Sequence, residues 1–301
     1  MKNQYFIFCI ILILDGCSSR QSQMKDFPGE MVSFSAYRGN PVFHGTDTNT
    51  WDKTIRERGF ILQEDGKYKL WYTGYNKEDS DPKSLGYATS SDGINWNRDP
   101  SNPVFSEKWT EDVFVLKNQG KYYLYAEGEN DIAHLLTSDD GIKWQEQGDL
   151  IIRMVNGDTI PGPYGTPDIL IENDVWYLFY ERMDEGIWVA KSDDHRVWKN
   201  IQDEPVLKRG PEKYDERMLA SNQVIKFNDK YYMFYHATAV DNTGIWTSNV
   251  AMSEDLIHWV KYPGNPIVPG DHSSPILVYD GEKYRLYTMH PTVWLYFSNI
   301  N

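Results

Sequence analysis

The stretch GKYKLWYTG (residues 66–74) decides the fold, because close copies of it recur along the chain. The other copies read GKYYLYAEG, DVWYLFYER, DKYYMFYHA and EKYRLYTMH, and they begin at Gly120, Asp174, Asp229 and Glu282. Aligned aromatic residues in successive copies are 53 to 55 residues apart. A near-constant period of this size indicates an array of supersecondary units. Each copy predicts a tight turn followed by an aromatic strand.

Two further repeated elements complete each unit. A turn of the type SxDGxxW ends at Trp96 and Trp144, and related turns end at Trp198 and Trp259. Asp and Gly suit this turn, because Asp caps backbone amides and Gly accepts positive φ, and the Trp can then pack between neighbouring sheets. An Asn-Pro or Glu-Pro element follows at residues 102–105, 204–207 and 265–268. An apolar run also precedes each aromatic strand, so a unit contains four strands.

Five units of four strands predict an all-β, five-bladed β-propeller. The fifth unit stops at residue 301 without an outer strand, whereas residues 31–43 end in Asn40-Pro41-Val42-Phe43, which matches the last element of a unit. We therefore expect the N-terminal strand to complete the last blade and close the ring, which removes an exposed sheet edge. The alternative is a β-sandwich whose spacing is coincidental.

The N-terminal residues predict export. Lys2 precedes an apolar run that is too short to span a membrane, so residues 1–17 resemble a signal peptide. The run ends in Leu14-Asp15-Gly16-Cys17, which resembles a bacterial lipobox and predicts lipidation of Cys17, although Asp15 is unusual there. Plain secretion is the alternative. Residues 18–30 then form a flexible tether, and residues 31–301 the propeller. The expected location is the cell envelope, either periplasm or cell surface.

Composition restricts the partners. The only cysteines are Cys9 and Cys17, so the mature chain would have neither a disulfide nor a thiol nucleophile. A net charge of −14 argues against nucleic acid or an anionic membrane surface as a partner. We expect a carbohydrate partner, and membrane contact only through the lipid. No cofactor is expected. The axis could accept a calcium ion near His272 or His290, although no ligand spacing of any strength predicts one.

Topology indicates where a site would form. Inner strands begin, and second strands end, on the same face of a propeller around the axis. Polar residues before the apolar runs and after the aromatic runs should therefore meet there. They include Trp51, Asp52, Arg56, Glu57, Arg58, Trp109, Glu111, Asp112, Glu127, Glu129, Tyr164, Thr166, Asp168, Glu181, Arg182, Asp215, Glu216, Arg217, Asn222, His236, Asp271, His272 and His290.

Converging carboxylates suit glycoside hydrolysis. A protonated acid donates to the leaving oxygen, and an ionised partner activates water or attacks carbon. Neighbouring like charges separate the two pKa values. Trp51 and Trp109 could stack on sugar faces, while arginines and histidines bond hydroxyl groups. The alternative for these aromatic residues is packing between blades.

The five blades, the SxDGxxW turns and the axial carboxylates resemble the propeller glycosidases of glycoside hydrolase families 43, 32, 117 and 130. Gly165-Thr166-Pro167-Asp168-Ile169 is similar to the Ala-Pro-Asp segment of family 43, which implies that Asp168 orients the acid and adjusts its pKa. Glu111-Asp112 is similar to the Glu-Asp-Pro-Arg segment of family 130, which implies acid/base work for Asp112. Val113 and Phe114 replace Pro-Arg, however, and Ser221 stands where family 43 has its acid.

The sequence thus predicts a hydrolase that cleaves an oligo- or polysaccharide with inversion. Asp112 is the expected acid/base, and Glu57 and Glu216 are candidates for the opposing carboxylate, with Glu181 also open. The substrate-binding candidates are Arg58, Glu111, Trp51, Trp109, Glu181, Arg182, Arg217, His236 and His272. Two alternatives remain. Arg58, Arg182 and Arg217 could bind phosphate in a phosphorylase of the mannoside type, and a surface lipoprotein could bind glycans without cleaving them.

Overall fold

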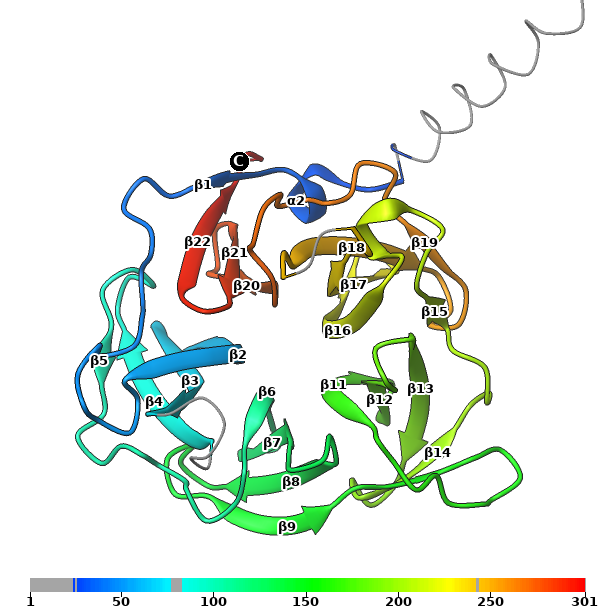
Figure 1. The fold of residues 1–301 in the computed structure, drawn as a ribbon, viewed down its shortest axis with the longest axis horizontal. Coiled ribbons are helices and arrows are strands. Elements are labelled where there is room, and N and C mark those ends of the chain that lie inside the picture. The colour runs from blue at the N-terminus through cyan, green and yellow to red at the C-terminus, as the bar shows by residue number, and fades with distance from the viewer. Residues whose placement is uncertain (1–23, 25, 77–82, 242–243, 301) are drawn as a thin grey trace, which may run out of the picture.

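Five sheets stand around a central axis in the computed structural model, which describes residues 24, 26–76, 83–241 and 244–300 (Figure 1). The inner strands of blades 1 to 5 are β2 (Thr54–Glu64), β6 (Glu111–Asn118), β11 (Gly165–Glu172), β16 (Met218–Phe227) and β20 (Ile276–Tyr279). The second strands, which contain the aromatic copies, are β3 (Lys67–Tyr75), β7 (Lys121–Glu127), β12 (Val175–Glu181), β17 (Lys230–Thr238) and β21 (Tyr284–Met289). The predicted five-bladed propeller is confirmed.

Outer strands complete the blades. The third strands are β4 (Ser84–Ser90), β8 (Ala133–Ser138), β13 (Gly186–Ser192), β18 (Thr247–Ser253) and β22 (Val293–Ser298). The fourth strands of blades 1 to 4 are β5 (Asn97–Arg98), β9 (Gln145–Asp149), β14 (Val197–Asn200) and β19 (Trp259–Lys261). Blade 3 has two additional short strands: β10 (Ile151–Arg153) runs parallel to β14, and β15 (Leu207–Lys208) pairs with β13.

The N-terminal segment closes the ring as predicted. Strand β1 (Phe34–Ala36) pairs antiparallel with β22, with Phe34 opposite Ser298. The Asn40 side chain then accepts a hydrogen bond from the Leu295 N–H and donates one to the Leu295 carbonyl, both at 2.8 Å. Asn102 makes the same pair of bonds to Tyr87 in blade 1. The N-terminus therefore supplies to blade 5 what blades 1 and 4 take from their own sequence.

The repeated turns act as the sequence predicts. In blade 1, the Asp92 carboxylate accepts hydrogen bonds from the amides of Ile94 and Asn95, each at 2.8 Å. The Trp that follows the turn packs against the preceding blade: Trp144 meets Trp71 with ring centroids 6.4 Å apart. Equivalent contacts join blade 3 to blade 2 and blade 4 to blade 3. These aromatic contacts fix the blades relative to one another.

The folded domain begins before the predicted boundary at residue 31. Helix α2 spans Gly29–Val32, and Phe27 is buried against Tyr232 and Tyr262. The end of the predicted tether is therefore part of the core, because an aromatic side chain there packs on blade 4. The predicted signal peptide and Cys17 lie outside the described residues. None of the helices in the described part is both long and apolar enough to cross a membrane.

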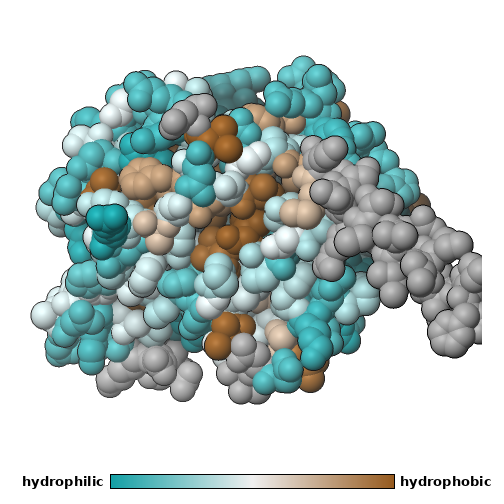
Figure 2. Space-filling model, turned by 90° about the horizontal axis from the view of Figure 1, so that it is seen from above, coloured by the Kyte–Doolittle hydropathy of each residue, from teal (hydrophilic) through white to brown (hydrophobic). Residues whose placement is uncertain are grey.

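The surface is largely hydrophilic on the side that Figure 2 shows. Seen from the edge that carries β1 and α2, apolar surface is confined to patches, and most of the surround is hydrophilic (Figure 2). The core lies between the blades, where buried aliphatic and aromatic residues from inner and second strands meet. A short 3₁₀ helix, η1 (Lys213–Asp215), leads into the inner strand of blade 4.

Candidate active site

The inner strands of blades 1 to 4 share a β-bulge near the axis. Register shifts occur between Arg56 and Phe60 in β2, and at the equivalent places in β6, β11 and β16. A bulge bends the strand and re-aims its side chains. Asp112 and Thr166 adopt positive φ at these bulges, 47° and 45°, and Ser274 does so in blade 5 at 57°. Such conformations are uncommon for these residue types and cluster at functional sites.

A cavity of about 330 Å³ opens at these bulges. Among the described residues, six carboxylates line it: Glu111, Asp112, Glu127, Asp131, Glu181 and Asp184. Three basic side chains, Arg56, His236 and His290, line it as well. Trp246 is also in the wall, and its ring meets that of His236 edge-on with centroids 5.1 Å apart. We call this the axial cavity. So many carboxylates in one cavity must be paired, protonated or used.

Glu127 and Glu181 form the center of the acidic cluster. Glu127 accepts a hydrogen bond from the Thr166 N–H at 2.8 Å, and Glu181 accepts one from the Gly165 N–H at 3.2 Å. A Cβ atom added to Gly165 would lie 2.1 Å from Glu127 Oε2 and 2.8 Å from Glu181 Oε1. Position 165 therefore requires glycine, because two carboxylates from different blades approach its Cα atom.

Burial controls the protonation of this pair. Burial raises the pKa of Glu127 well above its usual value, and the negative charges of Asp112 and Glu181 raise it further. Burial also raises the pKa of Glu181 to about 8, and the charge of Asp184 adds to that effect. Burial therefore favours the protonated form of both carboxyl groups.

Asp112 lies beside this pair in the same cavity and is largely buried. Its Oδ1 accepts a hydrogen bond from the Arg58 N–H at 2.9 Å. The Arg58 guanidinium donates to the Asp112 carbonyl, and its positive charge interacts favourably with the carboxylate. Asp112 is therefore held in one orientation by the neighbouring blade, next to carboxyl groups whose pKa values are raised.

Arg58 was expected to bind substrate, but the structure places its side chain beneath the cavity. The residue is fully buried and does not line the axial cavity. Its guanidinium donates to the carbonyls of Ser221 and Asn222 at 3.1 Å, and to that of Pro167 at 2.6 Å. One side chain from blade 1 thus connects the inner strands of blades 2, 3 and 4. Because the guanidinium donates its hydrogen bonds to backbone carbonyls, it does not extend into the cavity to bind a ligand.

Asp168 is also buried below the cavity. Its Oδ2 accepts a hydrogen bond from the Ser221 hydroxyl at 2.8 Å, and it does not line the axial cavity. Burial raises its pKa to about 6, although Ser221 and Arg58 oppose that shift. Ser221, which occupies the register position of Asp112 in blade 4, is therefore a partner of Asp168.

The other predicted residues divide into two groups. Glu111, Glu181 and His236 line the axial cavity with Asp112, as do Arg56, Glu127, Thr166 and His290 from the wider set. The remaining candidates do not line it: Glu216, Arg182, Arg217, His272, Trp51 and Trp109. Trp51 stacks on Tyr72 instead, His272 packs on Trp294, and Arg182 lies over the Trp188 ring. The Glu57 side chain lies outside the described residues.

Residues missed by the sequence analysis come from the loops beyond the second strands. Asp131 follows β7, Asp184 follows β12, and Trp246 precedes β18. The topological rule considered positions just after the aromatic runs, whereas these residues lie further along the loops and still line the cavity. Among the described residues, no group of three or more His, Cys, Asp or Glu side chains is arranged to hold a metal ion. The calcium ion stays a prediction.

The raised pKa values predict that stability falls as pH rises. A carboxyl group with a raised folded-state pKa binds its proton more tightly in the folded chain than in the unfolded one. Glu181 therefore favours folding fully below its usual pKa of 4.5, and this contribution is lost as pH rises through about 8. We expect the melting temperature of wild type to drop between about pH 5 and about pH 9. Glu181→Gln should flatten this drop in differential scanning calorimetry.

The matched control is Glu107→Gln, because Glu107 is exposed and lies outside the axial cavity. Its melting temperature should follow that of wild type across the pH range. Parallel curves for Glu181→Gln and wild type would contradict a raised pKa at Glu181.

Known proteins that resemble this chain act on carbohydrates. No protein-family model matches the chain. A 1,2-beta-oligomannan phosphorylase from Thermoanaerobacter sp. (strain X514) is 26% identical over 230 residues, which are 70% of this chain and 74% of that protein. The beta-1,2-mannobiose phosphorylase from Listeria innocua, in complex with beta-1,2-mannobiose, superposes with a TM-score of 0.67 at 16% identity and covers 87% of this chain and 95% of its own.

A second structure comes from the GH130 family of mannoside phosphorylases, described as containing glycoside hydrolases that target beta-1,2 mannosidic linkages in Candida mannan. It gives a TM-score of 0.71 at 15% identity, covering 91% of this chain and 96% of its own. The chain has the fold of the glycoside-active five-bladed propellers, with family 130 among its neighbours. A glycoside-processing enzyme is therefore supported. The two relatives named first are phosphorylases, whereas the sequence predicts a plain hydrolase.

Proposed function

We propose that the protein cleaves β-1,2-mannosidic bonds in the axial cavity. The observation that carries this proposal is the meeting of Asp112 with the buried Glu127–Glu181 pair at one opening. Cleavage of a glycosidic bond needs one carboxyl group that is protonated and another that is ionised. The choice of sugar rests on the relatives, whose names refer to β-1,2-linked mannosides.

The environments of the carboxyl groups favour a division of roles. The Glu127–Glu181 pair, kept protonated by burial, donates a proton to the leaving oxygen as the bond to the sugar breaks. Asp112 is fixed by the Arg58 N–H and assists the attacking group on the sugar carbon. Arg56, His236 and His290 surround the same space and can bond hydroxyl groups of the sugar.

Phosphate is the first candidate for the attacking group, because the named relatives are phosphorylases. The cations that could hold it are Arg56, His236 and His290, which all line the axial cavity. This differs from the sequence-based expectation, in which Arg58, Arg182 and Arg217 would bind phosphate. Arg58 instead bonds backbone carbonyls, and the other two lie outside the cavity.

Water is the second candidate, and the charge of the cavity favours it. Six carboxylates line the axial cavity against one arginine and two histidines. A phosphate dianion would be repelled by the carboxylates that remain ionised, whereas water would not. In that case an ionised carboxylate removes a proton from the attacking water. Inversion then needs room for that water, with carboxyl groups roughly 6.5–9.5 Å apart.

The test is incubation of the protein with β-1,2-mannobiose, with and without inorganic phosphate. Mannose 1-phosphate that forms only with phosphate supports phosphorolysis, whereas two mannose molecules formed equally with and without phosphate support hydrolysis. Proton NMR of the first product distinguishes inversion from retention. Binding of the disaccharide without any product would overturn the proposal and favour the non-catalytic, glycan-binding alternative.

We also propose export and lipidation at Cys17, and this part of the proposal rests on the sequence alone. They are compatible with an enzyme that meets glycans outside the cytoplasm. The test is fractionation of cells that express wild type or Cys17→Ala. The variant should leave the membrane fraction, and equal membrane association of both would contradict a lipid anchor.

A further inference from the structure

A second cavity, of about 390 Å³, lies beside the axial cavity between blades 1 and 5. Two chain segments contribute to both cavities. Thr54 and Ile55 line the second cavity, and the next residue, Arg56, lines the axial one. Pro291 and Thr292 likewise line the second cavity, directly after His290 in the axial wall. The two spaces therefore adjoin along two chain segments, in which one residue lines the axial cavity and its immediate neighbours line the second cavity.

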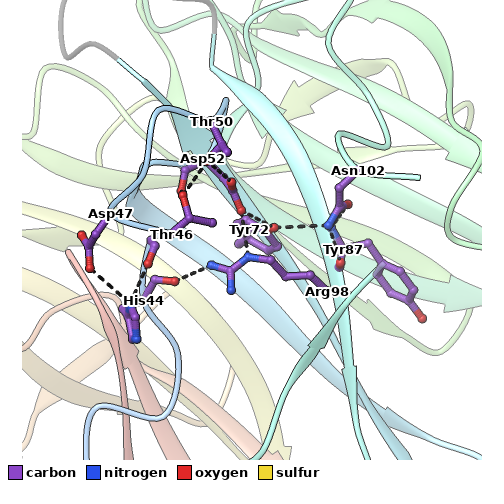
Figure 3. Close-up of polar contacts among 10 residues, drawn as sticks. His44, Thr46, Asp47, Thr50, Asp52, Tyr72, Tyr87, Arg98 and Asn102 are labelled. Carbon is purple, nitrogen blue, oxygen red and sulfur yellow. Dashed lines mark hydrogen bonds and ion pairs between the residues drawn. The ribbon is translucent and has the colours of Figure 1, made fainter. Parts of the chain in front are cut away.

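The loop that forms the outer wall of this second cavity is tightly held (Figure 3). The Thr46 N–H donates to the Asp52 carbonyl at 3.0 Å, and the Asp47 N–H donates to the Lys53 carbonyl at 3.1 Å. A Cβ added to Gly45 would lie 2.2 Å from the Lys53 carbonyl oxygen, so the two sides of the loop are in close contact. These contacts hold the loop backbone in place, and so they set the positions from which its side chains extend.

Asp52 anchors the loop to the blade beneath it. Its carboxylate is buried, and it accepts hydrogen bonds from the Tyr72 hydroxyl at 3.0 Å and from Arg98 Nε at 2.8 Å, as Figure 3 shows. Arg98 also donates to the His44 carbonyl. The sequence analysis placed Asp52 at the axial mouth. The structure uses it to fix the loop that carries His44, Asp47 and Lys53. Binding sites gain affinity when their loops are ordered in advance.

The lining of the second cavity suits a neutral, hydroxyl-rich ligand. Its polar side chains are His44, Asp47, Lys53, Thr54 and Thr292, which offer both donors and acceptors and carry charges of both signs. Pro41 and Pro291 add small apolar surfaces that can contact the C–H face of a sugar ring. Neither an anion nor a cation would find a matching excess of charge there. The volume falls in the range of small-ligand sites.

We propose that this second cavity is a subsite for the distal units of an oligosaccharide whose terminal bond is cleaved in the axial cavity. The subsite would make the enzyme prefer chains longer than a disaccharide. This inference rests on the proposed function, because it takes the axial cavity as the place where the bond is cleaved. Arg56 and His290 line the axial cavity directly beside residues of the second cavity, so they would contact the sugar unit that connects the two sites.

The test compares kcat/KM for a β-1,2-mannoside series from disaccharide to tetrasaccharide. For wild type, kcat/KM should rise about tenfold when the chain becomes long enough to reach the second cavity, mainly through a lower KM. Lys53→Ala and His44→Ala should remove most of that rise and leave the disaccharide unchanged. Both residues are exposed, so their melting temperatures should stay close to that of wild type.

Lys121→Ala is the matched control, because Lys121 is an exposed lysine that lines a separate cavity on blade 2. It should keep the full rise with chain length. Equal kcat/KM for every chain length in wild type would overturn the subsite, as would equal losses on disaccharide and tetrasaccharide in both variants.

Failure of the proposed function is distinguishable from failure of the subsite. If wild type does not cleave the disaccharide or any longer chain, the proposed function is wrong. Calorimetric titration with the tetrasaccharide then tests the second cavity directly. Binding that weakens about tenfold in Lys53→Ala, and not in Lys121→Ala, would support a glycan site there. Equal affinity of both variants, or no binding at all, would overturn it.

Discussion

Replacing Asp112 with asparagine should lower turnover of β-1,2-mannobiose by about 10²- to 10⁴-fold, because the amide can neither accept nor donate a proton as the carboxylate does. The fold should be kept. Asp112 has a φ of 47°, a conformation that asparagine adopts more readily than most residues, and the amide oxygen can still accept the Arg58 N–H. The measurement is kcat for the disaccharide, with the melting temperature recorded for the same preparation.

Asp139→Asn is the matched control, since Asp139 is an exposed aspartate in the turn after β8 of the same blade. It should have wild-type turnover. If Asp112→Asn retained activity within a few-fold of wild type, the acid/base role would move to the Glu127–Glu181 pair alone. Loss of activity together with a large drop in melting temperature would instead indicate a structural role.

Arg58→Met should lower the free energy of unfolding by about 3 kcal/mol or more, because it leaves several buried carbonyls without their donor. The guanidinium bonds carbonyls in three blades, and methionine can fill part of its space but cannot donate. Chemical denaturation followed by tryptophan fluorescence measures this effect. Arg58→Lys should be intermediate, because one ammonium group reaches fewer of these carbonyls than a planar guanidinium does.

Arg217→Met provides the comparison, because Arg217 is exposed and outside the axial cavity. Its unfolding should match that of wild type. An Arg58→Met variant with wild-type stability and a raised KM would restore the sequence-based view that Arg58 binds substrate.

Arg58 and Asp112 show where prediction from the sequence worked and where it did not. Arg58 and Asp112 occupy the same register position in successive repeats, so the sequence offered both as axial residues. The structure directs the Asp112 carboxylate into the cavity and the Arg58 guanidinium below it. A short carboxylate reaches only the nearest space. A long guanidinium can extend across the axis and bond the carbonyls that the bulges of other blades expose.

The site was predicted best for residues at the axial ends of first and second strands. Glu111, Asp112, Glu181 and His236 were placed by topology, and all four line the axial cavity. Glu216 and His272 were expected there by the same rule but do not line the cavity, although Ser273 and Ser274, directly after His272, do. Asp131 and Asp184 were missed since they belong to loops, whose paths depend on packing and not on a repeat.

The sequence by itself determined the number of blades, the order of strands within them and the closure of the ring. These features are carried by neighbours in the chain: turn residues, aromatic strands and the Asn-Pro element that recurs at Asn40. Only the tertiary structure decided that Glu127 and Glu181 share one buried space over Gly165, and that Arg58 is withdrawn from it. The physical reason is that protonation and burial depend on groups from different blades, whose separation across the axis no local pattern specifies.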